Sequence, residues 1–327
     1  MKAIVLCNIA TPQSSASEDV REYLSKFLSD RYVISIPQPF RSILVNGIII
    51  PRRLRHSTAR YRLLESLYEG EMPLRKYMNA LVETMQGLSQ DWDVFGYLQH
   101  GEERPEDLVA RLRARGNYTE IVVLPLFPHK TFSTYLSASR QLCRHLRRLL
   151  GEGVILRVTP PYFRHPHYIQ LIQKRLADTL DTPSDLYVAG FHSIPIKHQR
   201  MGRKRGFNYR EQCLETATQM FSILPHTTER RVYFQSALDR VHWIGPFLEE
   251  EMKGWVDEGF QRVTIACPGF AIDCLETVLD IGVVLREEFL SLGGQELRLL
   301  PALNGDEDVA DFLLSLAHES LDIPSAF

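Results

Sequence analysis

The sequence predicts an α/β protein with two similar halves, each built on a parallel β-sheet flanked by helices. Short apolar runs without polar alternation recur along the chain, which is typical of strands covered on both faces. Amphipathic stretches separate these runs, and strands that alternate with helices favour a parallel sheet. A third observation is an internal match between two segments at a constant spacing of 143 residues, as from Gly116 to Gly259.

Eight apolar runs have the length of strands. They cover residues 3–7, 94–98, 121–127, 154–158, 186–191, 232–235, 263–267 and 297–300. The clearest amphipathic stretches between them predict helices over residues 106–115, 136–150, 168–179, 249–258 and 306–319. The first apolar run is about five residues long, shorter than the apolar part of a signal peptide, so we expect a buried strand there.

The internal match joins a helix, a glycine stop, a buried strand and a proline turn in each half. The matched positions are Gly116, Pro125 and Phe127 in the first half and Gly259, Pro268 and Phe270 in the second. We therefore expect an N-terminal domain over residues 1–165 and a C-terminal domain over residues 166–327. The C-terminal helix is free to pack back on the first domain.

Composition and charge restrict the function classes. The chain has 327 residues, 44% of them hydrophobic and 24% charged, which is the balance of a globular protein with a large core. Lys and Arg number 38 against 40 Asp and Glu, which argues against a dedicated nucleic-acid binder. The five cysteines are scattered without a C-x-x-C pair, so they favour a reducing compartment and offer no zinc or iron–sulfur spacing. No apolar run approaches the roughly 20 residues of a membrane span, and we expect a cytoplasmic protein.

The sequence lacks the markers of three common enzyme classes. It contains no G-x-G-x-x-G after the first strand, no G-x-x-x-x-G-K-S/T and no G-x-S-x-G. The sequence therefore gives no support for a nicotinamide-dependent enzyme, an ATPase or an esterase.

A histidine lies at the end of a predicted strand. His192 directly follows the fifth run, and Pro195 makes the turn after it rigid. In open α/β sheets ligands collect at the carboxyl ends of strands. An imidazole there can act as a general base or a metal ligand, because the ordinary histidine pKa lies near neutrality. The alternative is a hydrogen-bonded turn histidine without a chemical role.

Three carboxylates follow the seventh predicted strand. Asp273, Glu276 and Asp280 are spaced i, i+3 and i+7, which places them on one face of a helix. A capping box with Asp273 as N-cap and Glu276 at N3 would explain two of them and leave Asp280 unexplained. The first half has Lys130 and Ser133 at the positions of the first two acids, so any acidic site belongs to the second half. Imidazole and carboxylate together suit Fe or Zn, and two protein ligands make an open site for a metal in transit.

Two other regions combine features that ligands use. Residues 33–55 form an apolar stretch, the apolar lip, whose flanking basic residues are Arg41, Arg52, Arg53 and Arg55. The apolar lip can hold a large flat ligand or touch a membrane surface, and the alternative is a core helix with a solvated basic end. A second basic run, residues 200–210, can meet ligand carboxylates or form a solvated loop.

Nine short stretches carry a family resemblance. They are Leu6-Cys7-Asn8-Ile9-Ala10-Thr11-Pro12, Phe27-Leu28-Ser29-Asp30, Val123-Leu124-Pro125-Leu126-Phe127-Pro128, Phe191-His192-Ser193-Ile194-Pro195, Phe234-Gln235-Ser236, Trp243-Ile244-Gly245-Pro246, Pro268-Gly269-Phe270, Asp273-Cys274-Leu275-Glu276-Thr277 and Leu300-Pro301-Ala302-Leu303-Asn304. In this order they resemble the ferrochelatases of haem biosynthesis, and they span nearly the whole chain. Two N-terminal regions, Met72-Pro73-Leu74 and Gln99-His100-Gly101, depart from the family pattern.

The resemblance implies two Rossmann-like, chelatase-type domains with a porphyrin cleft between them. It also implies an enzyme that inserts Fe²⁺ into protoporphyrin IX to give protohaem, with release of two protons. His192 and Glu276 match the family's catalytic and metal-binding pair. Asp273 and Asp280 match acidic positions on the same helix face, and we expect them to form a secondary acidic path. The positions expected to line the porphyrin cleft are Ile9, Trp243 and Ser193.

The resemblance further implies porphyrin and ferrous iron as substrates, with no tightly bound cofactor and no nucleic acid. No iron–sulfur cluster is expected, because the cysteines have no spacing that could hold one. We expect a monomer or weak homodimer in the cytoplasm that can contact the inner face of a membrane. Two other functions stay open: a cobalt chelatase acting on a sirohydrochlorin-like ring, and a porphyrin or haem carrier without catalysis.

Overall fold

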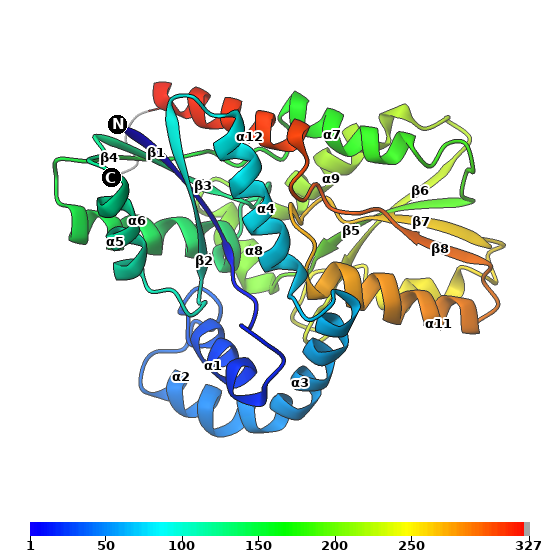
Figure 1. Cartoon of the computed structure of the whole chain (residues 1–327). Coiled ribbons are helices and arrows are strands. Elements are labelled where there is room, and N and C mark those ends of the chain that lie inside the picture. The colour runs from blue at the N-terminus through cyan, green and yellow to red at the C-terminus, as the bar shows by residue number, and fades with distance from the viewer. Residues whose placement is uncertain (324–327) are drawn as a thin grey trace. The chain divides into compact units, whose positions relative to one another are not determined.

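Two compact units, each with one parallel β-sheet, make up the computed structural model, which describes residues 1–323 (Figure 1). The first unit takes in Met1–Leu126, Phe132–Pro160 and the residues from Gly305 onward, and the second takes in Phe127–Thr131 and Pro161–Asn304. The sequence predicts contiguous domains divided at residue 165. Instead, a short piece after the third strand joins the second unit. The C-terminal helix belongs to the first unit, in agreement with the expectation that it packs back on that domain.

The first unit contains four strands and the helices that connect them. The strands are β1 (Lys2–Ile9), β2 (Trp92–Gln99), β3 (Glu120–Pro125) and β4 (Ile155–Val158). The α-helices are α1 (Ser17–Leu28), α2 (Phe40–Ser42), α3 (Ile50–Leu67), α4 (Pro73–Leu88), α5 (Pro105–Arg115), α6 (Ser137–Leu150) and α12 (Glu307–Glu319). Two π-helices, η1 (Ile43–Ile49) and η2 (Phe132–Leu136), and the 3₁₀-helix η6 (Ser320–Asp322) also belong to it.

The second unit has the same general content. Its strands are β5 (Leu186–His192), β6 (Glu229–Gln235), β7 (Arg262–Ala266) and β8 (Glu296–Leu299). Its α-helices are α7 (Pro166–Ala177), α8 (Ile196–Arg203), α9 (Tyr209–Met220), α10 (Leu248–Glu251) and α11 (Arg286–Ser291). The 3₁₀-helices η3 (Phe221–Ile223) and η4 (Met252–Gly254) and the π-helix η5 (Leu275–Leu285) lie between them.

The two sheets have the same strand order. It is β2-β1-β3-β4 in the first unit and β6-β5-β7-β8 in the second, and every neighbouring pair is parallel. All eight predicted runs overlap these strands, which confirms the prediction of two similar α/β halves. The chain reverses its direction of progress across the sheet between β1 and β3, and again between β5 and β7. Such reversals are the positions where open α/β sheets bind ligands.

One predicted helix has the wrong extent. The spacing predicts a helix over residues 249–258, whereas α10 spans Leu248–Glu251 and passes into the 3₁₀-helix Met252–Gly254. The chain then turns at residues 255–259 and Trp255 enters the core. A continuous amphipathic helix is therefore not needed to bury the apolar residues of this segment.

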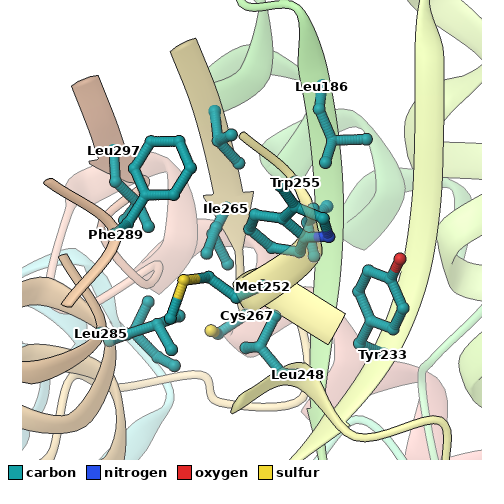
Figure 2. Close-up of a cluster of buried hydrophobic side chains, with 13 residues drawn as sticks. Leu186, Tyr233, Leu248, Met252, Trp255, Ile265, Cys267, Leu285, Phe289 and Leu297 are labelled. Carbon is teal, nitrogen blue, oxygen red and sulfur yellow. The ribbon is translucent and has the colours of Figure 1, made fainter. Parts of the chain in front are cut away.

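One face of the second sheet packs against a continuous apolar core. Leu186 and Val188 of β5 point to this face, because side chains alternate along a strand. The fully buried ring of Trp255 lies over the same face (Figure 2), and an aromatic of this kind typically contributes about 3–5 kcal/mol. Ile281 and Leu285 of η5 belong to the same cluster, so η5 covers this face. Figure 1 shows α11, which continues η5, and α7 on opposite sides of the sheet.

The opposite face of this sheet holds a buried histidine. The ring of His129 lies edge-on to that of Phe191 in β5, with 5.2 Å between centroids. The hydroxyl of Thr216 donates to the carbonyl of Phe163 at 2.7 Å, so it accepts from Nε2 of His129 at 2.9 Å. Nδ1 is left with its lone pair and has no partner among the described residues. Burial lowers the pKa of His129 to about 3.

None of the helices within residues 1–323 combines the length and the apolarity that a membrane span requires.

The buried histidine predicts an acid sensitivity of folding. The pKa of His129 is lowered in the folded protein, so between about pH 6.5 and pH 3 the unfolded chain binds the proton first and stability falls as the pH falls. The His129→Gln variant keeps an amide to donate to Thr216 and cannot titrate. Urea unfolding at pH 7.5 and pH 5 should show a loss of stability about 2 kcal/mol larger in the wild type than in the variant. Equal losses would show that this imidazole is not what makes the fold acid-sensitive.

Candidate active site

The carboxyl ends of two neighbouring strands bring the predicted residues to one edge of the second sheet. β5 and β7 are parallel partners, with Ala189 opposite Ala266. β5 ends at His192, and β7 leads through a turn into η5, which begins at Leu275 and carries Glu276. This edge lies at the reversal of chain progress across the sheet, where ligand sites form.

His192 points to the face of the sheet that η5 covers. It follows Leu186 and Val188 at intervals of two residues, so the alternation of strand side chains places it on their face. It lies beyond Gly190, whose missing side chain leaves room for Gln235 and Cys267 to meet across β5. The imidazole and the first residues of η5 therefore share one side of the sheet.

The imidazole has a defined tautomer. Nδ1 of His192 lies 2.5 Å from the carbonyl oxygen of Ser193, and a carbonyl can only accept. Nδ1 therefore carries the hydrogen, and Nε2 of the neutral ring has a free lone pair. From the other face, the hydroxyl of Tyr209 in α9 donates to the carbonyl of His192 at 2.8 Å. The orientation of the ring is thus set by contacts that leave Nε2 available.

Aromatic side chains flank the imidazole. The rings of Trp243 and Phe270 lie 6.3 and 6.4 Å from that of His192, measured between centroids. Both are half-buried, and they come from the loop after β6 and the turn after β7. They form apolar walls beside a nitrogen base, which suits a flat apolar ligand.

Ser193 is fully buried and holds the loop that carries Trp243. Its hydroxyl donates to the carbonyl of Ile244 at 2.6 Å, and its amide donates to the carbonyl of Gln235 at 2.8 Å. Ile244 in turn donates from its amide to Ile194 at 3.0 Å. The hydroxyl of Ser193 thus faces this loop, and its contact with porphyrin stays a prediction.

The capping interpretation of the acids is wrong. The N-cap of η5 is Cys274, whose amide donates to Oγ1 of Thr277 at 3.0 Å, so the box lies one residue later than the sequence predicts. Glu276 has no part in it. Its Oε2 instead accepts a hydrogen bond from Sγ of Cys274 at 3.1 Å, and burial together with the neighbouring carboxylate raises the pKa of that thiol. The thiol is therefore a donor, and the Glu276 carboxylate is half-buried beside it.

Asp273 differs from the other two acids, because three donors occupy its carboxylate. Thr277 Oγ1 donates to Oδ1 at 2.8 Å, while Asn304 Nδ2 and the amide of Ala302 donate to Oδ2 at 2.9 and 3.2 Å. Only 4% of Asp273 is exposed. A place for it on a secondary acidic path stays a prediction, and the contacts themselves describe a structural acid.

Asp280 lies on η5 and is half-buried. The predicted face assumes α-helical spacing, whereas η5 is a π-helix, in which hydrogen bonds run from i to i+5 and each turn is wider. Asp273 falls before the helix and leaves the row, so only Glu276 and Asp280 share the helix. Within the described part of the chain, no group of three or more His, Cys, Asp or Glu side chains is placed to hold a metal.

The first unit repeats this arrangement of strands and π-helix but lacks the histidine. Lys2 pairs with Glu120 and Leu186 with Val263, and these pairings give Asn8 the register position that His192 has in the second unit. The π-helices η2 and η5 begin at Phe132 and Leu275, again 143 residues apart, which confirms the internal match. Ile9 ends β1 in this first unit, and its contact with porphyrin stays a prediction.

Sequence reasoning missed the residues that support the pair. Tyr209 and Phe270 contact His192 from the elements on either side of it, and Cys274 and Asn304 act at the start of η5. Cys274 and Asn304 stand inside motifs of the family resemblance, which is the one signal that could have found them. Gln235 is also fully buried, and its Nε2 has no partner within residues 1–323.

Comparison with known proteins decides the family. Residues 1–321 match the family model Ferrochelatase. The chain belongs to the ferrochelatase family. A curated ferrochelatase of Porphyromonas gingivalis is 29% identical over 97% of this chain and 96% of its own length, and one of Pseudomonas aeruginosa is 31% identical over 92% and 93%. The predictions of a lyase-type metal chelatase and of iron insertion into a porphyrin are confirmed.

A solved chelatase shares the fold of this chain. The sirohydrochlorin chelatase SirB from Bacillus subtilis subspecies spizizenii, in complex with cobalt, aligns with a TM-score of 0.54 and 10% identity. The alignment covers 77% of this chain and 90% of SirB. At this identity the likeness concerns the fold alone. It confirms two chelatase-type Rossmann-like domains and leaves the cobalt alternative without support from the family.

The positions of the two acids on η5 predict different contributions to iron insertion. Glu276→Gln should lower kcat about 10²-fold or more, because it removes a charge and a proton acceptor at the strand edge. Asp280→Asn should lower kcat less than about tenfold, because its carboxylate lies further along the helix. Both constants are measured at saturating porphyrin and Fe²⁺. The reverse order would show that Asp280 is the reacting acid.

Proposed function

We propose that His192 and Glu276 carry out the insertion of Fe²⁺ into protoporphyrin IX at the carboxyl edge of β5 and β7. The observation that supports this most is the hydrogen bond from Nδ1 of His192 to the carbonyl of Ser193. It leaves Nε2 as an acceptor on the side of the sheet where Glu276 begins η5. A base and a carboxylate on one side of a strand edge are the groups that metallation of a porphyrin needs.

The reaction exchanges two protons for one divalent cation. Fe²⁺ forms bonds to the four pyrrole nitrogens, two N–H bonds break, and neither iron nor macrocycle changes oxidation state. Nε2 of His192 can accept one of these protons as a general base. The carboxylate of Glu276 balances the charge of the arriving cation or takes the second proton. The five cysteines are buried and free, and this proposal uses iron as substrate with no resident cofactor.

The aromatic walls give the site its shape preference. The rings of Trp243 and Phe270 both lie near the imidazole ring, and flat rings pack well against aromatic faces. A porphyrin must buckle before its nitrogen lone pairs can face the metal. Walls that hold the buckled ring better than the planar ring would lower the barrier, which is catalysis by differential binding.

We also propose that the apolar lip contacts the inner face of a membrane. Phe40, Ile43 and Ile48 are 67%, 63% and 41% exposed, although they are large apolar side chains. Arg52 and Arg53 are exposed just after them and suit anionic headgroups. The sequence alternative of a core helix fits only the buried positions in this stretch. We further propose a monomer or weak homodimer in solution, which sedimentation velocity tests directly.

The proposed roles of His192 and Glu276 can be tested in an anaerobic assay of iron insertion. Purified protein, protoporphyrin IX and Fe²⁺ are mixed, and loss of porphyrin fluorescence and the shift of the Soret band are followed. His192→Ala should lower turnover by at least about 10²-fold, because the proton acceptor is gone, while porphyrin still binds. Turnover retained in the variant would remove His192 from the mechanism. Porphyrin binding without turnover in the wild type would favour the carrier function.

The apolar lip predicts binding to anionic vesicles. Phe40→Ser combined with Ile43→Ser should reduce co-sedimentation with phosphatidylglycerol vesicles by about fivefold or more, since buried apolar area supplies part of the affinity. Val284→Ser combined with Leu292→Ser is the matched control, because these exposed apolar residues lie outside the lip. Raised salt should weaken wild-type binding further. Equal loss in both double variants would contradict the placement of the contact.

A further inference from the structure

Asn304 and Asp273 bind each other through two reciprocal hydrogen bonds. Nδ2 of Asn304 donates to Oδ2 of Asp273 at 2.9 Å, and Oδ1 of Asn304 accepts from the amide of Asp273 at 2.9 Å. Both residues are buried, Asn304 with 8% of its surface exposed. The carboxamide therefore meets both the side chain and the backbone of one residue, which only Asn or a close analogue can do in this geometry.

The backbone of Asn304 is bound to the same turn. Its amide donates to the carbonyl of Ala271 at 3.0 Å. Its φ is 55°, in the left-handed region that Asn tolerates better than most residues. Asn304 is also the last residue of the second unit, before the chain enters the first. The segment before α12 is thus held to the turn that precedes η5.

A short chain of contacts connects this pair to Glu276. Thr277, which is 1% exposed, donates from Oγ1 to Asp273 and accepts at Oγ1 from the amide of Cys274. Cys274 donates from Sγ to the carboxylate of Glu276. Glu276 lies between Cys274 and Thr277 in sequence, so contacts on both sides of it lead back to Asp273.

We propose that Asn304 is a positioning residue for Glu276, acting through Asp273 and the first residues of η5, and that Asp273 serves the same positioning purpose instead of carrying metal or protons. The proposal deepens the function given above and rests on it. It explains why the most buried of the three acids accepts three hydrogen bonds from the protein. It also assigns a purpose to the Leu300–Asn304 motif, which no step of the reaction uses directly.

Positioning and an acidic path predict opposite results for three variants. If Asp273 carries charge to the metal, Asp273→Asn is damaging, Asn304→Ala is nearly silent, and exchanging the two residues does not help. If the pair positions Glu276, Asn304→Ala is damaging. The exchange variant Asp273→Asn/Asn304→Asp then restores a carboxylate opposite a carboxamide and recovers most of the activity, since only the contact from the amide of Ala302 is lost. Thr179→Ala is the matched control, because it removes one buried hydroxyl, bonded to the carbonyl of Leu176 at the end of α7.

The experiment measures kcat, KM for Fe²⁺, the porphyrin dissociation constant and the melting temperature of all four variants. Asn304→Ala should lower kcat/KM for Fe²⁺ about 10–100-fold, the usual cost of removing a partner that orients a reacting group. Porphyrin affinity should stay within about twofold, and the exchange variant should return to within about fivefold of wild type. Thr179→Ala should lower the melting temperature and leave kcat/KM unchanged. Kinetics of Asn304→Ala like those of wild type, or an exchange variant no better than Asp273→Asn, would overturn the proposal.

Hydrogen exchange gives a readout that does not depend on turnover. Amides of residues 271–279 should exchange faster in Asn304→Ala and return toward wild-type rates in the exchange variant, because the hydrogen bond between residues 273 and 304 is lost in the first and restored in the second. Unchanged exchange in Asn304→Ala would overturn the proposal whatever the activity. A wild-type protein that binds porphyrin without metallating it, while the exchange pattern appears as expected, would instead overturn the proposed function and still support the structural role of the Asn304–Asp273 pair.

Discussion

The parallel pairing of β5 with β7 is the constraint on which the site depends. Parallel register puts both carboxyl ends at one edge, and the crossover between these strands must then run over a face of the sheet. The helix after β7 covers the face to which alternate residues of β5 point, and Trp255 with Ile281 and Leu285 makes that packing apolar and tight. His192 and the start of η5 therefore share a side of the sheet as a consequence of core packing. The apolar core places these residues together, and any reaction that they carry out depends on that placement.

The two units share a fold but differ in the reactive residues at matched positions. Both units have the same strand order, and each has a π-helix starting at the matched position. The first unit nonetheless carries Asn8 where the second carries His192, and Ser133 where the second carries Glu276. An asparagine and a serine can donate and accept hydrogen bonds, but neither can take up a proton near neutral pH. The two residues proposed for the reaction are thus present in one half only.

Local pattern was enough to predict the strands, their parallel arrangement and the histidine at a strand end, because each depends on a short run of sequence. The failures have long-range causes. The capping box was placed one residue early because Asp273 is bound by Asn304, 31 residues away, and is unavailable as a cap. The helix predicted over residues 249–258 breaks because Trp255 turns into the core. The aligned row of three acids required α-helical spacing, and η5 has π-helical spacing. The local sequence pattern predicts none of these contacts.

The division of labour among the acids follows from their hydrogen bonds. A carboxylate that accepts three hydrogen bonds is held in one place by its donors. Asp273 is in that state and is buried as well. Glu276 accepts from the weak thiol donor of Cys274 and is half-buried, so its carboxylate can still respond to charge that develops nearby. We therefore propose proton and metal transfer for Glu276, which accepts one weak hydrogen bond from a thiol, and a positioning role for Asp273.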